Sequence, residues 1–281
     1  MTPFREDGTI NERAVEALVE KNIEKGVSGF YVGGSSGESY LLSMEERKHM
    51  LEIVMSAAAG RVDVIANIGV FSTEHGIQLA RHAQELGVAA ISSVPPFYFP
   101  FTMDEYAGYY SEIAGAVSVP MILYNIPAMS RVHFGREDID KFFSVEQIVG
   151  MKHTSYDLFL LQKMIENYPD KTIFIGHDEL FLPAYTVGAR AAIGSTFNFM
   201  AEKFIQMEAL IESKEIDRAL AIQGEVNAVV EVLSDIGVFK GVKAALRMQG
   251  IDCGVCRKPF ATLDIEDEKR LEAVLLKNGC L

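Results

Sequence analysis

Residues 148–179 read IVGMKHTSYDLFLLQKMIENYPDKTIFIGHDE, and the order of residue types in this stretch predicts a strand, a helix and a second strand. Ile148–Ser155 and Thr172–Glu179 both open with short apolar runs that contain β-branched residues, which favour strands. Between them, Asp157–Tyr168 has apolar residues at helical spacing and opens with a good capping residue. Strands that alternate with helices in this way predict a parallel sheet with helices outside it.

The same alternation continues in both directions from this stretch. Besides those two segments, the expected strands are Gly29–Gly34, Val62–Gly69, Ala89–Pro96, Pro120–Pro127 and Ala191–Asn198. The expected helices between the strands include Asn11–Gly26, Ser43–Gly60, Thr73–Gly87 and Met103–Val117. Ser43 and Glu46 have the spacing of a capping box. The near-constant repeat favours an α/β fold of the (β/α)8 TIM barrel type over an open sheet, and we interpret Met1–Phe4 as the stub of a truncated first strand.

After Asn198 the pattern becomes helical to the end of the chain. We therefore predict two parts, a barrel over residues 1–199 and a helical extension over residues 200–281 that packs on it. The helices expected in the extension are Ala201–Ser213, Glu215–Asp235, Val238–Gln249 and Ile265–Lys277.

Composition excludes several classes of function. The chain has 281 residues, 49% of them hydrophobic, so it can bury a large core. A formal net charge of -13 argues against nucleic acid and against an anionic membrane surface as partners. All apolar stretches are shorter than the roughly 18 residues that a membrane helix needs. Three cysteines and no targeting pattern favour a reducing compartment, by default the cytoplasm.

Lys152 follows an apolar strand run, although lysine is rarely buried without a partner or a task. Burial lowers the pKa of an amine, and a neutral amine can attack a ketone to form a Schiff base. The alternative is a side chain that snorkels to solvent at a strand end. This segment alone favours neither interpretation.

Other polar side chains also follow the predicted strands, at the end of a barrel where active sites form. Gly33–Glu38 offers backbone N–H groups and two hydroxyls that suit a carboxylate or phosphate, although a structural turn uses the same residues. Tyr124 ends an apolar run and could exchange protons with a nearby amine, although a lone tyrosine in this position is more often part of the core.

Three of these segments together resemble motifs of the pyruvate-dependent class I aldolase superfamily, which includes dihydrodipicolinate synthases and N-acetylneuraminate lyases. Gly34–Glu38 resembles the carboxylate-binding signature, Tyr124–Pro127 the tyrosine segment and Gly150–Lys152 the Schiff-base lysine segment. The resemblance covers nearly the whole chain. It implies a carbon–carbon lyase in which Lys152 forms the Schiff base, so that no metal or organic cofactor is required.

The resemblance also implies roles for the residues around that lysine. Tyr124 and Ser35 would relay protons, and Ser35 and Ser36 would hold the substrate carboxylate. Tyr98 is similar to a tyrosine that family members insert into the site of a neighbouring subunit, which implies a homotetramer.

Within the superfamily the chain is most similar to the lyases. The segments that carry this similarity are Val94–Phe101, Gly176–Glu179, Ile193–Asn198 and Cys256–Phe260. The synthases have an arginine where this chain has Met129. The substrates implied are pyruvate and a sugar acid, N-acetylneuraminate, cleaved to pyruvate and N-acetylmannosamine. The residues implied to bind the sugar are Thr154, Gly176, Asp178, Glu179 and Ser195.

Several alternatives remain open on the sequence. For Asp178 and Glu179, spacing alone favours acids that complement a helix dipole. Arg131 and Tyr156 replace small residues of typical lyases and could reshape the sugar side. Another 2-keto-3-deoxy sugar acid, a dihydrodipicolinate synthase-like condensation, or a non-catalytic barrel that binds pyruvate or a sugar acid are the competing functions. Cys253 and Cys256 form a Cys-x-x-Cys without a second ligand pair, which is weak evidence for a metal or redox role.

Overall fold

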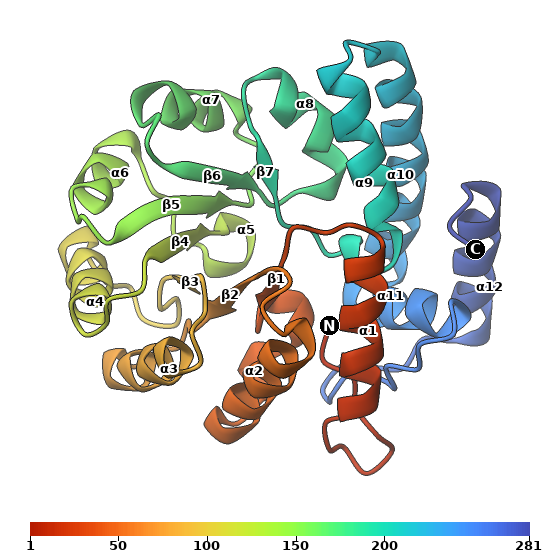
Figure 1. Cartoon of the computed structure of the whole chain (residues 1–281), viewed down its shortest axis with the longest axis horizontal. Coiled ribbons are helices and arrows are strands. Elements are labelled where there is room, and N and C mark those ends of the chain that lie inside the picture. Colours follow the sequence, from red (N-terminus) through yellow and green to blue (C-terminus); the bar gives the residue numbers. More distant parts are fainter.

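The computed structural model describes residues 1–281, and a curled sheet of seven parallel strands lies at its centre (Figure 1). Strand order follows chain order, and each strand pairs with the next. The strands are β1 (Gly29–Val32), β2 (Asp63–Asn67), β3 (Ala90–Ser93), β4 (Met121–Asn125), β5 (Ile148–His153), β6 (Thr172–Ile175) and β7 (Ala191–Ala192). All seven predicted strands are confirmed. Each ends earlier than predicted, so the polar residues at the exits lie in loops.

Helices surround this sheet (Figure 1). They are α1 (Glu12–Glu24), α2 (Met44–Ala58), α3 (Thr73–Glu85), α4 (Met103–Gly115), α5 (Pro127–Ser130), α6 (Arg136–Phe143), α7 (Leu158–Asn167) and α8 (Phe181–Thr186). The predicted capping box is present, because Ser43 Oγ accepts from the Glu46 N–H at 3.1 Å and Glu46 Oε2 accepts from the Ser43 N–H at 2.8 Å. Helices α5, α6 and α8 are additional to the predicted ones.

Residues 1–4 do not form the expected strand. Phe4 makes only an isolated antiparallel bridge with Ile10. The Met1 ammonium instead donates to Asn198 Oδ1 at 3.0 Å, beyond the end of β7. Strands β1 and β7 therefore have no ladder between them, and the barrel-type sheet has seven strands in place of the expected eight.

The chain after β7 is helical, as predicted. Its helices are α9 (Phe197–Glu212), α10 (Ile216–Ile236), α11 (Val238–Met248) and α12 (Ile265–Lys277). Helix α9 begins before residue 199 and has a kink at Met200, whose backbone is not helical. One hydrophobic cluster joins residues of the sheet to residues of these helices. The division into residues 1–199 and 200–281 stays a prediction.

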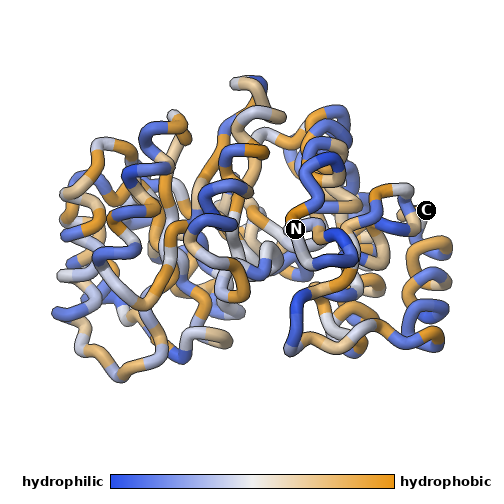
Figure 2. The backbone as a smooth tube through the Cα atoms, turned by 90° about the horizontal axis from the view of Figure 1, so that it is seen from below, coloured by the Kyte–Doolittle hydropathy of each residue, from blue (hydrophilic) through white to orange (hydrophobic).

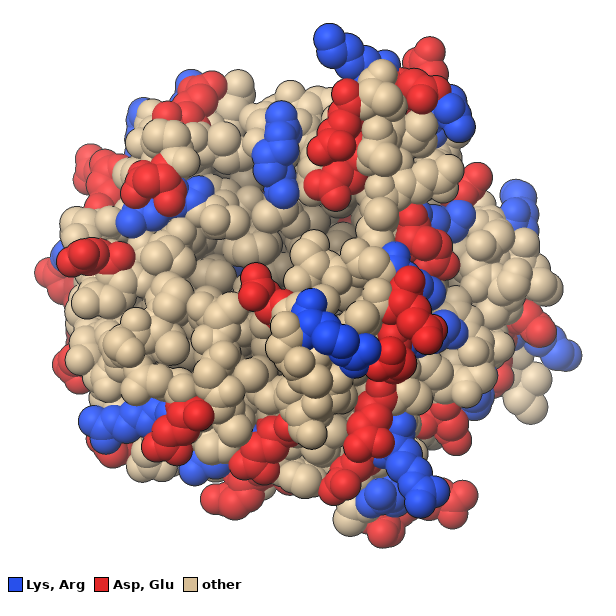
Figure 3. Space-filling view, viewed as in Figure 1, with Lys and Arg blue, Asp and Glu red and all other residues tan.

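Hydrophobic and hydrophilic residues alternate along the surrounding helices, as Figure 2 shows. Such alternation buries one face of each helix and leaves the other in water. On the face seen in Figure 3, acidic and basic side chains lie around the rim and also near the centre, but few of them lie in the hollow itself. None of the helices combines the length and the apolar character needed to cross a bilayer.

Candidate active site

Lys152 lies on β5, one residue before the strand ends, and its side chain faces the inside of the sheet. The residue is only 7% exposed. Its Nζ lies 4.1 Å from the centre of the Tyr124 ring and 4.7 Å from that of the Tyr31 ring. It has no ion pair with a carboxylate. A buried amine held between two aromatic faces does not match the snorkelling alternative.

A cavity of about 1070 Å³ opens around this amine. Nine of the ten candidate residues line it: Ser35, Ser36, Tyr124, Lys152, Thr154, Gly176, Asp178, Glu179 and Ser195. The exception is Tyr98. The strand exits named from the sequence therefore converge on one site, as expected when parallel strands end at one face of a barrel.

The register of the sheet explains why Tyr124 and Lys152 are neighbours. Tyr124 on β4 pairs directly with Lys152 on β5, so both side chains point inward from the same level. Tyr31 completes the aromatic enclosure, with its ring edge-on to that of Tyr124 at 5.8 Å and its hydroxyl donating to Ser92 Oγ at 2.9 Å. Burial raises the pKa of Tyr31 well above its ordinary value, so its hydroxyl stays protonated. The sequence did not single out Tyr31, because a tyrosine in a strand is ordinarily part of the core.

The turn after β1 is held in place by the buried side chain of the residue that follows it. Residues Ser35–Gly37 form one 3-10 turn, whose first amides are not used by the turn itself. Glu38 follows in the left-handed region, with φ of 58°, and its side chain is fully buried. Its carboxylate pairs with Lys243 Nζ at 2.8 Å and accepts from the Arg257 N–H at 2.7 Å. These bonds fix the turn that carries Ser35 and Ser36.

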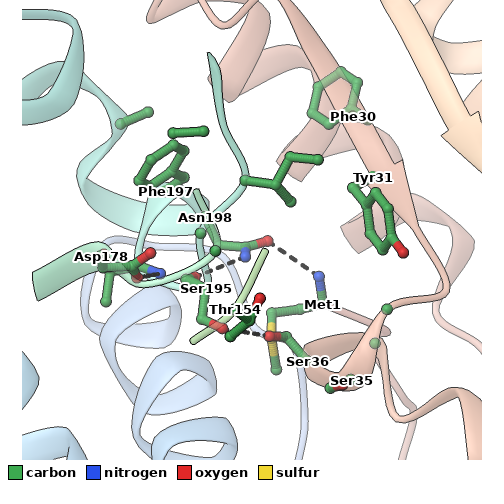
Figure 4. A pocket seen from close by; sticks show the side chains of 18 of the residues that line it. Met1, Phe30, Tyr31, Ser35, Ser36, Thr154, Asp178, Ser195, Phe197 and Asn198 are labelled. Carbon is green, nitrogen blue, oxygen red and sulfur yellow. Dashed lines mark hydrogen bonds between the residues drawn. The ribbon is translucent and has the colours of Figure 1, made fainter. Parts of the chain in front are cut away.

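Side chains from the first and the last strand exits meet across the cavity (Figure 4). Ser36 Oγ and Ser195 Oγ are 2.6 Å apart, which is a hydrogen bond. Thr154 Oγ1 is buried and has no hydrogen-bond partner. Because a buried hydroxyl without a partner is costly, Thr154 is a candidate to bind a polar ligand.

Gly176 gives Thr154 and Lys152 their space. A Cβ at position 176 would lie 1.8 Å from Thr154 Oγ1 and 3.1 Å from Lys152 Cε. Gly176 is required for this close packing, since any side chain there would displace the two groups beside it. Its expected role in substrate binding stays a prediction.

Asp178 and Glu179 differ in their surroundings. Asp178 is buried, and its Oδ2 accepts from the Thr196 N–H at 2.8 Å, which ties the exit of β6 to that of β7. Burial raises the pKa of Asp178, although the bonds from Thr196 act against it. Its Oδ1 sits where a Cβ of residue 194 would be, at 1.8 Å, so Gly194 is required there. Asp178 thus has a structural task. It also stands with Glu179 in the first turn of the 3-10 helix Asp178–Leu180, as the helix-dipole alternative expects. Its binding of the sugar stays a prediction.

Glu179 is bound by side chains at the cavity wall. Its Oε1 lies 3.0 Å from His177 Nδ1 and accepts from Tyr156 Oη at 2.9 Å. Burial raises the pKa of Glu179, but the hydrogen bonds from His177 and Tyr156 outweigh it and lower the value overall. Glu179 is therefore a carboxylate at neutral pH.

Other polar residues near the strand exits lie outside the cavity. His153 alternates with Lys152 and faces outward, fully buried, with Nδ1 3.1 Å from Asn125 Nδ2. Burial lowers its pKa to about 4. His153 does not line the cavity, so it is not placed to contact a substrate there. Of the two departures from typical lyases, Tyr156 lines the cavity and Arg131 does not.

Tyr98 is 76% exposed and belongs to an aromatic surface outside the cavity. Its ring contacts those of Phe71 and Phe99 edge-on. The three cysteines are free and buried, and no group of three potential metal ligands gathers anywhere in the chain.

Comparisons with known proteins agree with this geometry. The sequence profile of the dihydrodipicolinate synthetase family matches residues 1–278. The N-acetylneuraminate lyase of Rhizobium meliloti is 38% identical over 267 residues, 95% of this chain and 89% of that protein. The lyase of Fusobacterium nucleatum is 37% identical over 282 residues, 99% of this chain and 97% of that protein.

Solved structures show the same similarity. The Clostridium difficile protein CdNal in complex with mannosamine superposes with a TM-score of 0.96, at 34% identity over 99% of this chain and 96% of that one. The Fusobacterium nucleatum lyase complexed with pyruvate gives 0.93, at 35% identity over 99% and 94%. Family profile, sequence identity and barrel-type fold all agree, and the chain belongs to the dihydrodipicolinate synthetase family.

Proposed function

We propose that this protein is a class I aldolase that cleaves N-acetylneuraminate reversibly to pyruvate and N-acetylmannosamine. The observation that carries the proposal is the buried Lys152 amine, which has no ion-pair partner and faces a cavity lined by Tyr124 and the Ser35–Ser36 turn. The lyases among its relatives, with 36 to 38% identity, support the choice of substrate.

In the first step, the turn after β1 orients the substrate. The amides and hydroxyls of Ser35 and Ser36 bind the carboxylate of the open-chain sugar acid, next to Lys152. The Lys152 amine then attacks the C2 ketone, and loss of water gives a protonated imine. The imine nitrogen can accept an electron pair, so the reaction needs no cofactor for this purpose.

In the second step, the C3–C4 bond breaks. Its electron pair moves into the imine and leaves an enamine on Lys152, while the C4 hydroxyl loses its proton and becomes the aldehyde of N-acetylmannosamine. Tyr124, directly beside Lys152, relays that proton: its oxygen accepts it while its own proton passes on to Ser35 or the substrate carboxylate, from which it can return to C3. Protonation of the enamine at C3 and hydrolysis of the imine release pyruvate and restore the amine.

The rest of the sugar extends along the cavity wall. The partnerless Thr154 hydroxyl and the ionised Glu179 supply hydrogen-bonding groups for its hydroxyls, and Ser195 can exchange its bond to Ser36 for one to substrate. Met129 lines the cavity at the position where the synthases have their arginine, so a second carboxylate would find no cation there. This observation favours the lyase over a synthase-like condensation.

Pyruvate release from N-acetylneuraminate and from six-carbon 2-keto-3-deoxy acids tests the substrate. We expect a kcat/KM at least about tenfold higher for N-acetylneuraminate, which corresponds to about 1.4 kcal/mol of transition-state binding. Equal or better rates on the shorter acids would replace the lyase with another aldolase. Binding of pyruvate without turnover of any sugar acid would leave the non-catalytic barrel.

The proposal includes a homotetramer in which Tyr98 of one subunit completes the site of another. Its support is the exposed aromatic surface around Tyr98, outside its own cavity, and the resemblance to family members that share sites in this way. Light scattering measures the size. Mixing inactive Lys152→Met with impaired Tyr98→Ala subunits should restore activity if sites are shared, and mixtures as inactive as their components would contradict it. A reducing compartment, the cytoplasm, fits the three free thiols.

A further inference from the structure

Tyr156 is an exposed aromatic residue that is nevertheless held in place. It lies in the loop between β5 and α7, is 68% exposed, and lines the cavity. Its ring stacks on the imidazole of His177, with centres 4.3 Å apart and planes at 25°. Its hydroxyl donates to Glu179 Oε1 at 2.9 Å. Two contacts thus fix a side chain that solvent would otherwise leave mobile.

The two oxygens of the Glu179 carboxylate have different surroundings. Oε1 accepts from Tyr156 and also pairs with His177 Nδ1 at 3.0 Å. No side chain of the protein donates a hydrogen bond to Oε2, since both side-chain partners contact Oε1. Two donors on one oxygen fix the orientation of the carboxylate, and an ionised oxygen without a donor is an acceptor for hydroxyl groups.

The position of this group along the cavity sets which substrates can reach it. Thr154 and Gly176 lie against Lys152 itself, because a Cβ at 176 would touch both neighbours. Tyr156 and Glu179 come two and three residues later in the same two loops. A molecule bound covalently to Lys152 therefore meets Thr154 first and reaches Glu179 only if it extends several carbons further.

We propose that Tyr156 is a specificity-determining and positioning residue. By its bond to Glu179 and its stacking on His177, it fixes the Glu179 carboxylate as the acceptor for hydroxyls at the far end of a long polyhydroxylated 2-keto acid. Shorter keto acids use the same lysine but do not reach this acceptor. The inference rests on the aldolase function proposed above, and it adds a residue that selects substrate length.

Two variants separate the hydroxyl from the ring. Tyr156→Phe keeps the ring that stacks on His177 and removes the donor to Glu179, and Tyr156→Gly removes both. Phe159→Ala is the matched control, since Phe159 is 70% exposed on α7 and does not line the cavity. Each protein is assayed for cleavage of N-acetylneuraminate and of a six-carbon 2-keto-3-deoxy acid, with kcat and KM determined separately.

For Tyr156→Phe we expect KM for N-acetylneuraminate to rise about tenfold, as for the loss of one hydrogen bond to a charged group, with kcat within about twofold. Tyr156→Gly should raise it further. With the six-carbon acid, both variants and Phe159→Ala should stay within about twofold of the unmodified protein. Equal losses on both substrates, or an unchanged KM for N-acetylneuraminate, would overturn the inference.

Borohydride trapping of pyruvate separates this failure from failure of the proposed function. If every variant forms the adduct on Lys152 but the change in KM is the same for the long and the short substrate, only the role of Tyr156 is defeated. No adduct in the unmodified protein defeats both.

Discussion

Replacing Lys243 with methionine tests how the turn that carries Ser35 and Ser36 is held. The Lys243 and Glu38 side chains are 2% and 0% exposed, and their charged atoms are 2.8 Å apart. Removing the lysine charge leaves a buried carboxylate whose main remaining donor is the Arg257 N–H. Breaking a buried pair in this way costs about 3–5 kcal/mol, because the remaining charge stays out of water without compensation.

The loss is measured by urea unfolding at pH 7 and by thermal unfolding. At about 2–4 °C for each kcal/mol, we expect the unfolding temperature of Lys243→Met to fall by about 6–20 °C. The KM for pyruvate should rise as well, since Glu38 directly follows the turn. Arg270→Met is the control, because the Arg270–Asp235 pair has a similar distance of 3.0 Å but lies in solvent, where such pairs contribute about 0–1 kcal/mol.

The double variant Lys243→Met with Glu38→Gln distinguishes an uncompensated charge from a simple loss of packing. Removing both charges should recover much of the stability, since a neutral buried pair carries no desolvation penalty for an ion. This reasoning would be refuted if Lys243→Met lowered the free energy of unfolding by less than about 1 kcal/mol. It would also be refuted if the double variant were no more stable than Lys243→Met.

Three further predictions concern Gly176, His153 and Tyr31. Gly176→Ala should lower kcat/KM for N-acetylneuraminate by about 100-fold or more, because its methyl group would displace Thr154 and Lys152. Near-normal kinetics would mean that the neighbouring side chains can move aside without loss of activity. His153 has a pKa of about 4 when folded and about 6.5 when unfolded, so the unfolded chain binds its proton more readily. The contribution of His153 to the free energy of unfolding, roughly 3 kcal/mol, is therefore present above pH 6.5 and is lost as pH falls toward 4. Urea unfolding at pH 7 and pH 5 should show a steeper loss than in His153→Asn. Tyr31→Phe should lower the free energy of unfolding by about 1 kcal/mol through loss of the hydrogen bond to Ser92, and it should leave turnover within about twofold because the ring beside Lys152 remains. Tyr31→Ala removes that ring and should lower turnover sharply.

The sheet could be predicted from the sequence because its strands are short apolar runs between amphipathic helices. The site at the strand exits could be predicted for the same reason, since parallel strands deliver their exits to one face. Residues 1–4 were predicted wrongly, because four residues near a chain end carry too little pattern to distinguish a strand from an irregular segment.

The remaining parts depend on contacts between distant segments. Tyr31 encloses the amine only because β1 curls round to face β5, which no local pattern reveals. Glu38 is part of a motif, but its partner Lys243 lies on α11, far along the chain. The hydrogen bond that the Thr196 N–H donates to Asp178 joins two strand exits that are neighbours only in the folded sheet, so no local pattern could predict it.

Borohydride reduction in the presence of pyruvate tests the central claim, the Schiff base on Lys152, most directly. The protein is reduced with and without pyruvate, digested, and analysed by mass spectrometry. We predict that Lys152 becomes N-(1-carboxyethyl)lysine only when pyruvate is present, that activity is lost in step with labelling, and that Lys152→Met takes up no label. An unlabelled Lys152, or labelling of Lys152→Met to the same extent at another lysine, would contradict the account.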